Sequence, residues 1–190
     1  MLAQSAEMVR RGFDIDARLE ALVQGEAPVA SVDMRIADDG SWFHDGGKIT
    51  RMELVKLFAS ALHRAPDGSY WLVTPVEAVR VVVEDVPFTV VELEQMASGE
   101  DQVLRLRSNL DEWIDLDDLH PLEMRAVSDG RPPVPYVTLR PATGRRLALQ
   151  ARLLRPVFYH LVELAEPMAE GVVGIKSAGS WFPLGTVEPA

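Results

Sequence analysis

The sequence of 190 residues contains no cysteine and only three lysines, against 16 arginines. The lack of cysteine excludes a disulfide framework, a thiolate zinc site and a cysteine nucleophile, and it fits a reducing compartment. No apolar run approaches the roughly 18 residues that a membrane-spanning helix needs. Residues 1–12 also lack the charged and then apolar pattern of a signal peptide. We therefore expect a cytoplasmic protein without a membrane span.

Acidic residues outnumber basic ones by 29 to 19, so the formal net charge is −10. A field of this sign repels phosphate, which argues against binding to duplex DNA or to an anionic membrane. Residues 130–162 nevertheless contain six arginines and no acid. This arginine-rich segment favours a small anionic or nucleotide-like ligand, because the guanidinium group binds phosphates and carboxylates through two hydrogen bonds. Codon usage explains the excess of arginine over lysine equally well.

The spacing of apolar residues predicts two helices in the first part of the chain, over 13–25 and 50–64. Thr50 followed by Glu53 fits a capping box at the start of the second helix. The predicted buried face of that helix consists of Leu54, Leu57, Phe58, Ala61 and Leu62.

Residues 31–37 alternate between apolar and polar side chains, which is typical of a half-buried strand, and the turn at 38–40 predicts a hairpin. Thr74-Pro75 then breaks a later strand, and we place a domain boundary there. Residues 1–75 are thus predicted to form an N-terminal α+β half with two helices and a hairpin.

Seven short strand signals follow, separated mostly by turn residues. They lie at 76–84, 88–96, 103–107, 113–116, 123–127, 136–140 and 146–152. A helix with Pro156 in its first turn comes next, and a terminal hairpin lies in 171–187. The predicted fold class is α+β, and residues 76–190 are expected to form a small antiparallel barrel closed by one helix, with that hairpin at its end.

A tetrapeptide occurs twice, as Gly40-Ser41-Trp42-Phe43 and as Gly179-Ser180-Trp181-Phe182, each with a glycine three residues further on. One interpretation is an internal duplication that produced two interlocked half-domains. The other is that each Trp-Phe pair is only a core anchor beside a permissive glycine turn.

Several stretches, taken in order, resemble the uncharacterised bacterial family known as domain of unknown function 1285. They are Trp42-Phe43-His44-Asp45-Gly46, Leu57-Phe58-Ala59-Ser60, Asp67-Gly68-Ser69-Tyr70, Leu72-Val73-Thr74-Pro75-Val76-Glu77, Val83-Glu84-Asp85-Val86-Pro87-Phe88, Pro135-Tyr136-Val137 and Arg155 to Tyr159. The resemblance implies a duplicated α+β core whose C-terminal half is similar to a pleckstrin-homology barrel. It also implies a nucleotide-like ligand between the halves and a role in signal transduction. No catalytic residues are established for the family, so the resemblance implies none here.

Basic residues at two predicted helix starts are the candidate binding groups. A cation is unfavourable at a helix N-terminus, and a bound phosphate would relieve this. The predicted phosphate contacts are Arg51, Arg152 and Arg155; Tyr70 or Tyr159 would stack on a base, and Thr74 and Glu77 would line the cleft. The alternative is that these arginines form structural ion pairs with Glu77, Glu84 or Asp85.

Signals for catalysis or metal binding are weak in this sequence. The acidic cluster from Asp111 to Asp118 lacks the pattern of a calcium loop, and the four histidines lack metal-binding spacing. We predict no catalytic residues, no metal and no cofactor. The favoured function is a non-enzymatic ligand-binding module. A protein-interaction scaffold of pleckstrin type is the alternative, and an enzyme using His44, Asp45, Glu84 and Asp85 is the least favoured class.

Overall fold

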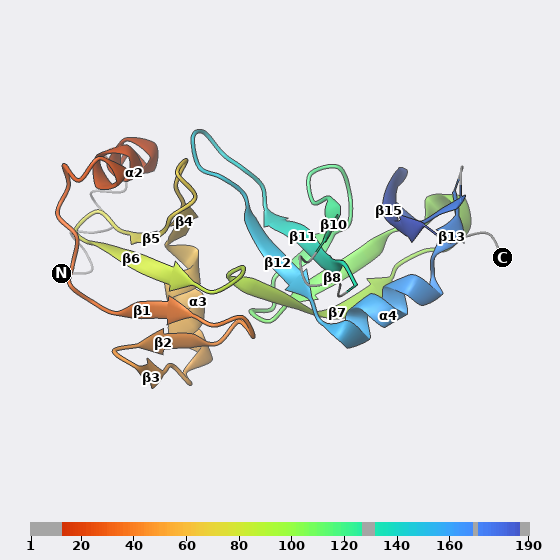
Figure 1. Cartoon of the computed structure of the whole chain (residues 1–190), viewed down its shortest axis with the longest axis horizontal. Helices are drawn as coiled ribbons and strands as arrows, with labels where there is room; N and C mark the ends of the chain where they lie inside the picture. Colours follow the sequence, from red (N-terminus) through yellow and green to blue (C-terminus); the bar gives the residue numbers. More distant parts are fainter. Residues whose placement is uncertain (1–12, 127–131, 169–170, 187–190) are drawn as a thin grey trace. The chain divides into compact units, whose positions relative to one another are not determined.

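The computed structural model describes residues 13–126, 132–168 and 171–186 (Figure 1). Residues 127–131, which include the last residue of the predicted strand 123–127 and Arg131 of the arginine-rich segment, lie outside the described residues. The chain divides into two compact units. Unit 1 is Met1–Asp85 with Ala142–Leu149, and unit 2 is Val86–Pro141 with Gln150–Ala190.

Unit 1 contains a six-stranded sheet and two helices in its described residues. Its elements are α2 (Ile15–Val23), β1 (Met34–Ile36), β2 (Trp42–His44), β3 (Gly47–Lys48), α3 (Met52–Ser60), β4 (Leu62–Arg64), β5 (Tyr70–Val73) and β6 (Ala78–Val83). The strand order is β3-β2-β1-β6-β5-β4. The first unit ends at Asp85 and not at the predicted position 75, because β6 pairs with both β1 and β5.

Helix α2 lies within the predicted range of 13–25 and is two residues shorter at each end. The Asp14 carboxylate accepts a hydrogen bond from the Ala17 N–H at 3.0 Å, which caps the first turn. Gly25, with φ of 75°, follows the helix in the left-handed conformation. The apolar face of α2 packs on β5 in a core cluster that contains Leu19, Leu22, Ala65, Trp71, Val73 and Ala78.

Helix α3 is shorter than the predicted helix over 50–64. It ends at Ser60, and the chain continues as β4, which pairs antiparallel with β5. The N-cap is Arg51, and it makes no side-chain capping hydrogen bond, so the predicted capping box from Thr50 to Glu53 is wrong. Pairing with β5 satisfies the backbone groups of residues 62–64, which local apolar spacing cannot reveal.

The buried face of α3 also differs from the predicted one. Val55 and Ala59 are buried, whereas Leu57 is 63% exposed. Phe58 contacts the sheet by stacking on Trp42, with 6.4 Å between the ring centroids. Leu62 is buried, but as a strand residue of β4.

Unit 2 contains a second six-stranded sheet, with the order β10-β11-β12-β7-β8-β9. Its strands are β7 (Phe88–Gln95), β8 (Leu104–Ser108), β9 (Trp113–Asp115), β10 (Leu122–Arg125), β11 (Val134–Arg140) and β12 (Leu149–Leu153). Helix α4 (Arg155–Glu163) packs against β7. A short 3-10 helix, η1 (Gly99–Asp101), and a three-stranded sheet of β13 (Glu166–Pro167), β14 (Val172–Ser177) and β15 (Ser180–Thr186) complete the described elements.

The prediction of an all-antiparallel barrel in the C-terminal half is wrong in one respect. The strands β7 and β12 run parallel, with Ala151 opposite Phe88. Pairing between the first and last strand of a sheet depends on contacts distant in sequence, so turn residues do not encode it. The first of the seven predicted strands is β6, which belongs to unit 1. The protein is therefore a mostly-β fold of two units, with three α-helices in the described residues.

The two six-stranded sheets share one strand order. When the strands of each unit are numbered one to six along the chain, both sheets read 3-2-1-6-5-4, with strands one and six parallel in the middle. The repeated tetrapeptide does not follow this common order. Its first copy leads into β2 of the unit 1 sheet, and its second copy leads into β15 of the separate three-stranded sheet.

The two copies of the tetrapeptide share a turn and differ in burial. Gly40 and Gly179 both have left-handed φ angles, 80° and 81°. Trp42 is 1% exposed, whereas Trp181 is 40% exposed and Phe182 beside it is buried. The two copies therefore share a turn conformation, while the buried aromatic residue changes from the tryptophan to the phenylalanine.

The turn between β4 and β5 makes the free energy of unfolding depend on pH. Ser69 donates hydrogen bonds from its hydroxyl and its N–H to the Asp67 carboxylate, and these hold the pKa of Asp67 below its ordinary value of 3.8. A carboxyl group with a lowered pKa stabilises the fold above its unfolded pKa, and this contribution is lost as pH falls through the folded pKa. We expect Asp67→Asn to flatten the loss of stability below about pH 4. Urea unfolding at several pH values measures this, and equal slopes for both proteins would contradict it.

Candidate functional site

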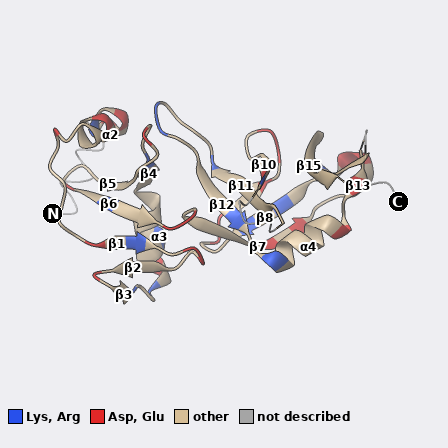
Figure 2. Cartoon of the chain, in the orientation of Figure 1, with Lys and Arg blue, Asp and Glu red and all other residues tan. Residues whose placement is uncertain are grey.

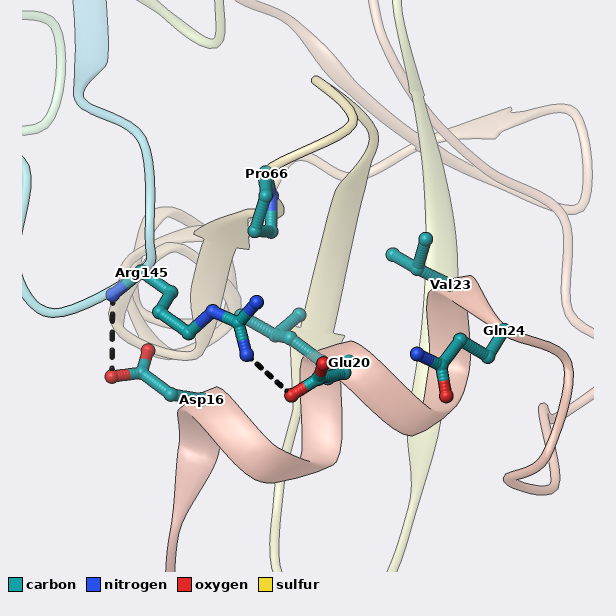
Figure 3. A pocket seen from close by; sticks show the side chains of 7 residues that line it. Asp16, Glu20, Val23, Gln24, Pro66 and Arg145 are labelled. Carbon is teal, nitrogen blue, oxygen red and sulfur yellow. Dashed lines mark hydrogen bonds and ion pairs between the residues drawn. The ribbon is translucent and has the colours of Figure 1, made fainter.

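A small cavity lies beside α2 in unit 1 (Figure 3). Its volume is about 180 Å³. It is lined by Asp16, Leu19, Glu20, Val23 and Gln24 of α2 and its C-cap, by Pro66 after β4, and by Arg145. Four kinds of side chain therefore meet there: carboxylates, one guanidinium group, the amide of Gln24, and the aliphatic groups of Leu19, Val23 and Pro66.

One wall of the cavity is the loop 142–149, which joins β11 to β12 and belongs to unit 1. The Leu147 N–H donates to the Arg64 carbonyl oxygen at 2.9 Å, so the loop is attached to β4. Thr143 and Arg146 close a tight turn by exchanging backbone hydrogen bonds. Gly144 in this turn has φ of 61°, and its Cα faces the Asp16 carboxylate so closely that an added Cβ would lie 2.1 Å from Oδ2.

Two ion pairs connect the loop to α2. Arg145 Nη1 lies 2.6 Å from Glu20 Oε2, and Arg146 Nε lies 3.0 Å from Asp16 Oδ1. The Arg145 N–H also donates to Asp16 Oδ2 at 3.4 Å (Figure 3). Asp16 Oδ1 is buried and accepts no hydrogen bond from the described residues, so its charge is balanced mainly by the adjacent arginine. The pair of Arg145 and Glu20 is the more exposed of the two.

Three of the six arginines in the arginine-rich segment have carboxylate partners in the structure. Arg140 binds Glu112 through two hydrogen bonds, at 2.9 and 2.5 Å. Arg145 and Arg146 are paired with the acids of α2. These three arginines form ion pairs with carboxylates that are distant in the sequence. Glu84 pairs instead with Arg35, at 2.5 Å.

Four of the predicted ligand-binding residues lie in unit 1, outside the lining of the cavity. The Thr74 hydroxyl donates to the Glu77 carbonyl oxygen and accepts from its N–H, both at 3.0 Å, so these residues form a turn. Tyr70 lies under the Arg64 guanidinium group, 5.4 Å from the ring centroid. Arg51 is exposed and has no ion pair within the described ranges.

The other three predicted residues lie close together along the chain in unit 2. Arg152 is on β12, and Arg155 and Tyr159 are one turn apart on α4. Arg155 is exposed, and no described residue forms an ion pair with it; Tyr159 is 62% exposed. The first turn of α4 contains no acid and no side-chain cap. Figure 2 shows the basic start of this helix and the acidic residue at its end.

The sequence analysis did not single out Asp16 and Glu20. Their spacing of four places both carboxylates on one face of the predicted helix, and this was the available signal. It is weak, because an acidic pair on a helix is usually solvated. Only the loop 142–149 gives the pair its arginine partners, across a separation of 125 residues between Glu20 and Arg145.

The acidic cluster from Asp111 to Asp118 consists of paired groups. Asp111 pairs with Arg107, Asp115 with Arg105, and Asp117 with His120, at 2.8 to 3.0 Å. In the part of the chain that the structure describes, no group of three or more histidine, aspartate or glutamate side chains is arranged to hold a metal ion. No described helix has the length and hydropathy needed to cross a membrane.

The fold and the cavity define a mostly-β protein of two units with a small, charged and partly apolar site in the first. Residues 27–86 match the N-terminal domain model of DUF1285, a domain of unknown function, and residues 87–184 match the C-terminal domain model. The chain belongs to the DUF1285 family. The boundary between the two matched ranges lies between residues 86 and 87, one residue from the division between the units after Asp85.

Two crystal structures of family members are similar to this chain. A DUF1285 family protein from Silicibacter pomeroyi DSS-3 has 38% sequence identity and a TM-score of 0.73, over 82% of this chain and 81% of that chain. A DUF1285 family protein from Shewanella baltica OS155 has 28% identity and a TM-score of 0.50, over 70% of this chain and 92% of that chain. No curated protein matches this chain.

Proposed function

We propose that this protein is a non-enzymatic ligand-binding module and that its ligand occupies the cavity beside α2. The observation that carries this proposal is the exposed pair of Arg145 and Glu20 at a hollow of about 180 Å³ with apolar lining. A few convergent polar groups beside apolar surface are the usual composition of a small-molecule site.

The ion pair is suited to exchange partners with a ligand. The side chains of Arg145 and Glu20 are 63% and 44% exposed, and exposed pairs contribute only about 0–1 kcal/mol to stability. The wall itself does not depend on this pair, because the hydrogen bond from Leu147 to Arg64 and the pair of Arg146 with Asp16 also hold the loop. Arg145 can therefore turn to a ligand while the cavity stays formed.

Recognition is favoured over catalysis by the residues that line the cavity. They include no histidine, serine or threonine, and their two acids are both engaged by arginines. General acid–base or nucleophilic chemistry needs such a group within reach of the substrate. The lining offers charge recognition and apolar contact.

A ligand of this cavity should depend on Arg145. We expect a compound that raises the melting temperature of the parent protein to lose most of this effect in Arg145→Gln, because the ligand then lacks its guanidinium partner. A ligand at one hundred times its dissociation constant adds about 2.7 kcal/mol, which a thermal-shift screen of small metabolites detects readily.

Arg18→Gln is the matched control, since Arg18 is on the same helix but does not line the cavity. It should respond to the compound as the parent does. The proposal fails if no compound in the screen stabilises the parent protein, or if every stabilising compound acts equally on Arg145→Gln.

A second candidate, a phosphate-bearing or nucleotide-like ligand at the start of α4, is favoured by the exposed Arg155 without an ion pair among the described residues. The N–H groups of the first turn would bind the phosphate, with Arg152 and Tyr159 nearby in the chain. Arg155→Glu should then abolish binding of a nucleoside monophosphate and leave the unfolding curve unchanged. Calorimetric titration measures this, and an unchanged affinity would reject the placement.

The alternative of a protein-interaction scaffold rests on the pleckstrin-homology resemblance proposed for unit 2. This resemblance is supported by a six-stranded sheet followed by α4 after its last strand. In such a scaffold a peptide would pair with an outer strand, here β9 or β10. Either binding function would suit a role in signal transduction.

A further inference from the structure

We infer that the ligand of the cavity beside α2 is a small zwitterion, an α-amino acid with a short aliphatic side chain. This inference rests on the proposed function and narrows its ligand. It follows from the balance of charge in the cavity, from which groups remain accessible there, and from the size of its apolar part.

The charges around the cavity cancel. Asp16 and Glu20 are matched by Arg146 and Arg145, each pair within 3.0 Å. Asp16 is committed to the loop, because one of its oxygens is buried and the other accepts from the Arg145 N–H and faces Gly144. Glu20 and Arg145 are therefore the charged groups that can face a ligand.

A ligand with one charge would leave one member of this pair without a partner. An anion that binds Arg145 displaces Glu20 and lies beside its carboxylate, and a cation that binds Glu20 lies beside the guanidinium group. A zwitterion gives a partner to both side chains at once. The partner atoms Arg145 Nη1 and Glu20 Oε2 are 2.6 Å apart, which suits a ligand whose ammonium and carboxylate groups are attached to one carbon.

The remaining lining selects the rest of the ligand. Val23 and Pro66 are exposed and offer aliphatic surface, while Leu19 is only 1% exposed, and Gln24 adds one amide group. A volume of about 180 Å³ equals about six water molecules at roughly 30 Å³ each. A side chain of the size of valine fits this space.

Calorimetric titration of the full chain with L-valine and two analogues tests this inference. Valinamide keeps only the positive charge, and N-acetylvaline keeps only the negative one. We expect each analogue to bind at least tenfold more weakly than L-valine, because each leaves a charged side chain unpaired. This comparison uses the unaltered protein, so it does not depend on how any variant folds.

Glu20→Gln should weaken L-valine binding at least tenfold, since the ammonium group loses its charged partner. Glu53→Gln is the matched control, because Glu53 is exposed on α3 and outside the cavity, and it should bind as the parent does. The inference is overturned if N-acetylvaline or valinamide binds as tightly as L-valine. It is also overturned if no aliphatic amino acid binds while another compound stabilises the protein through Arg145; in that case the proposed function stands. If no compound binds at all, both fail.

Discussion

Replacing Trp42 with alanine is expected to lower the free energy of unfolding by about 3–5 kcal/mol. The side chain is 1% exposed on β2, and its ring stacks on Phe58 of α3. Removing it deletes this stacking contact between the helix and the sheet and leaves a large cavity in the core of unit 1. Trp181, the equivalent residue of the second tetrapeptide, is 40% exposed, so Trp181→Ala should cost about 1 kcal/mol or less.

Trp42→Phe distinguishes apolar packing from hydrogen bonding at the same position. The indole N–H of Trp42 is buried and donates to no acceptor among the described residues. Phenylalanine keeps an aromatic ring and removes this unsatisfied donor, which alone costs about 1–3 kcal/mol. We therefore expect Trp42→Phe to lose less than half of the stability that Trp42→Ala loses. Equilibrium unfolding in urea measures all three variants. Equal losses for Trp42→Ala and Trp181→Ala would contradict the difference in burial.

The elements that local sequence determines were predicted well. Helix α2 has its own cap at Asp14 and its own stop at Gly25, and the observed helix lies within the predicted range. The strands of unit 2 are separated by turn residues, and each predicted segment overlaps an observed strand. Apolar alternation and turn chemistry act over a few residues, so they can be recognised without the rest of the chain.

Features that depend on distant pairing were missed. The apolar pattern continues from α3 into Leu62, and only the pairing of β4 with β5 ends the helix at Ser60. The division between units was placed too early because β6 joins the first unit through β1, more than 40 residues before it in the chain. No periodicity within one segment contains this information.

The candidate site was also missed because it depends on pairing between residues that are distant in the sequence. The arginine-rich segment was identified, but its charges were interpreted as available to a ligand. In the structure Arg140, Arg145 and Arg146 pair with carboxylates that precede them by 28 to 130 residues. Counting charges in one segment predicts where cations lie, and it does not predict which of them the fold itself neutralises.

The loop 142–149 should be sensitive at Gly144. We expect Gly144→Ala to lower the free energy of unfolding by about 2–4 kcal/mol, since two costs add. The residue has φ of 61°, a conformation that L-amino acids avoid, and the new Cβ would lie 2.1 Å from Asp16 Oδ2. The loop must then move away from α2, and Arg145 moves with it, so ligand binding in the cavity should be lost together with stability.

Gly46→Ala is the matched control for the contact with Asp16. Gly46 has φ of 76°, but no atom lies within 4 Å of an added Cβ, so only the backbone strain of about 1–2 kcal/mol remains. In the Asp16→Ala background the new Cβ at position 144 no longer meets the carboxylate. The cost of Gly144→Ala, measured relative to Asp16→Ala alone, should then fall to that of Gly46→Ala. Urea unfolding of Gly144→Ala, Gly46→Ala, Asp16→Ala and the double variant measures each term. If Gly144→Ala costs no more stability than Gly46→Ala in the parent background, the close contact between the loop 142–149 and Asp16 is wrong. The position of Arg145 in the cavity wall is then wrong as well.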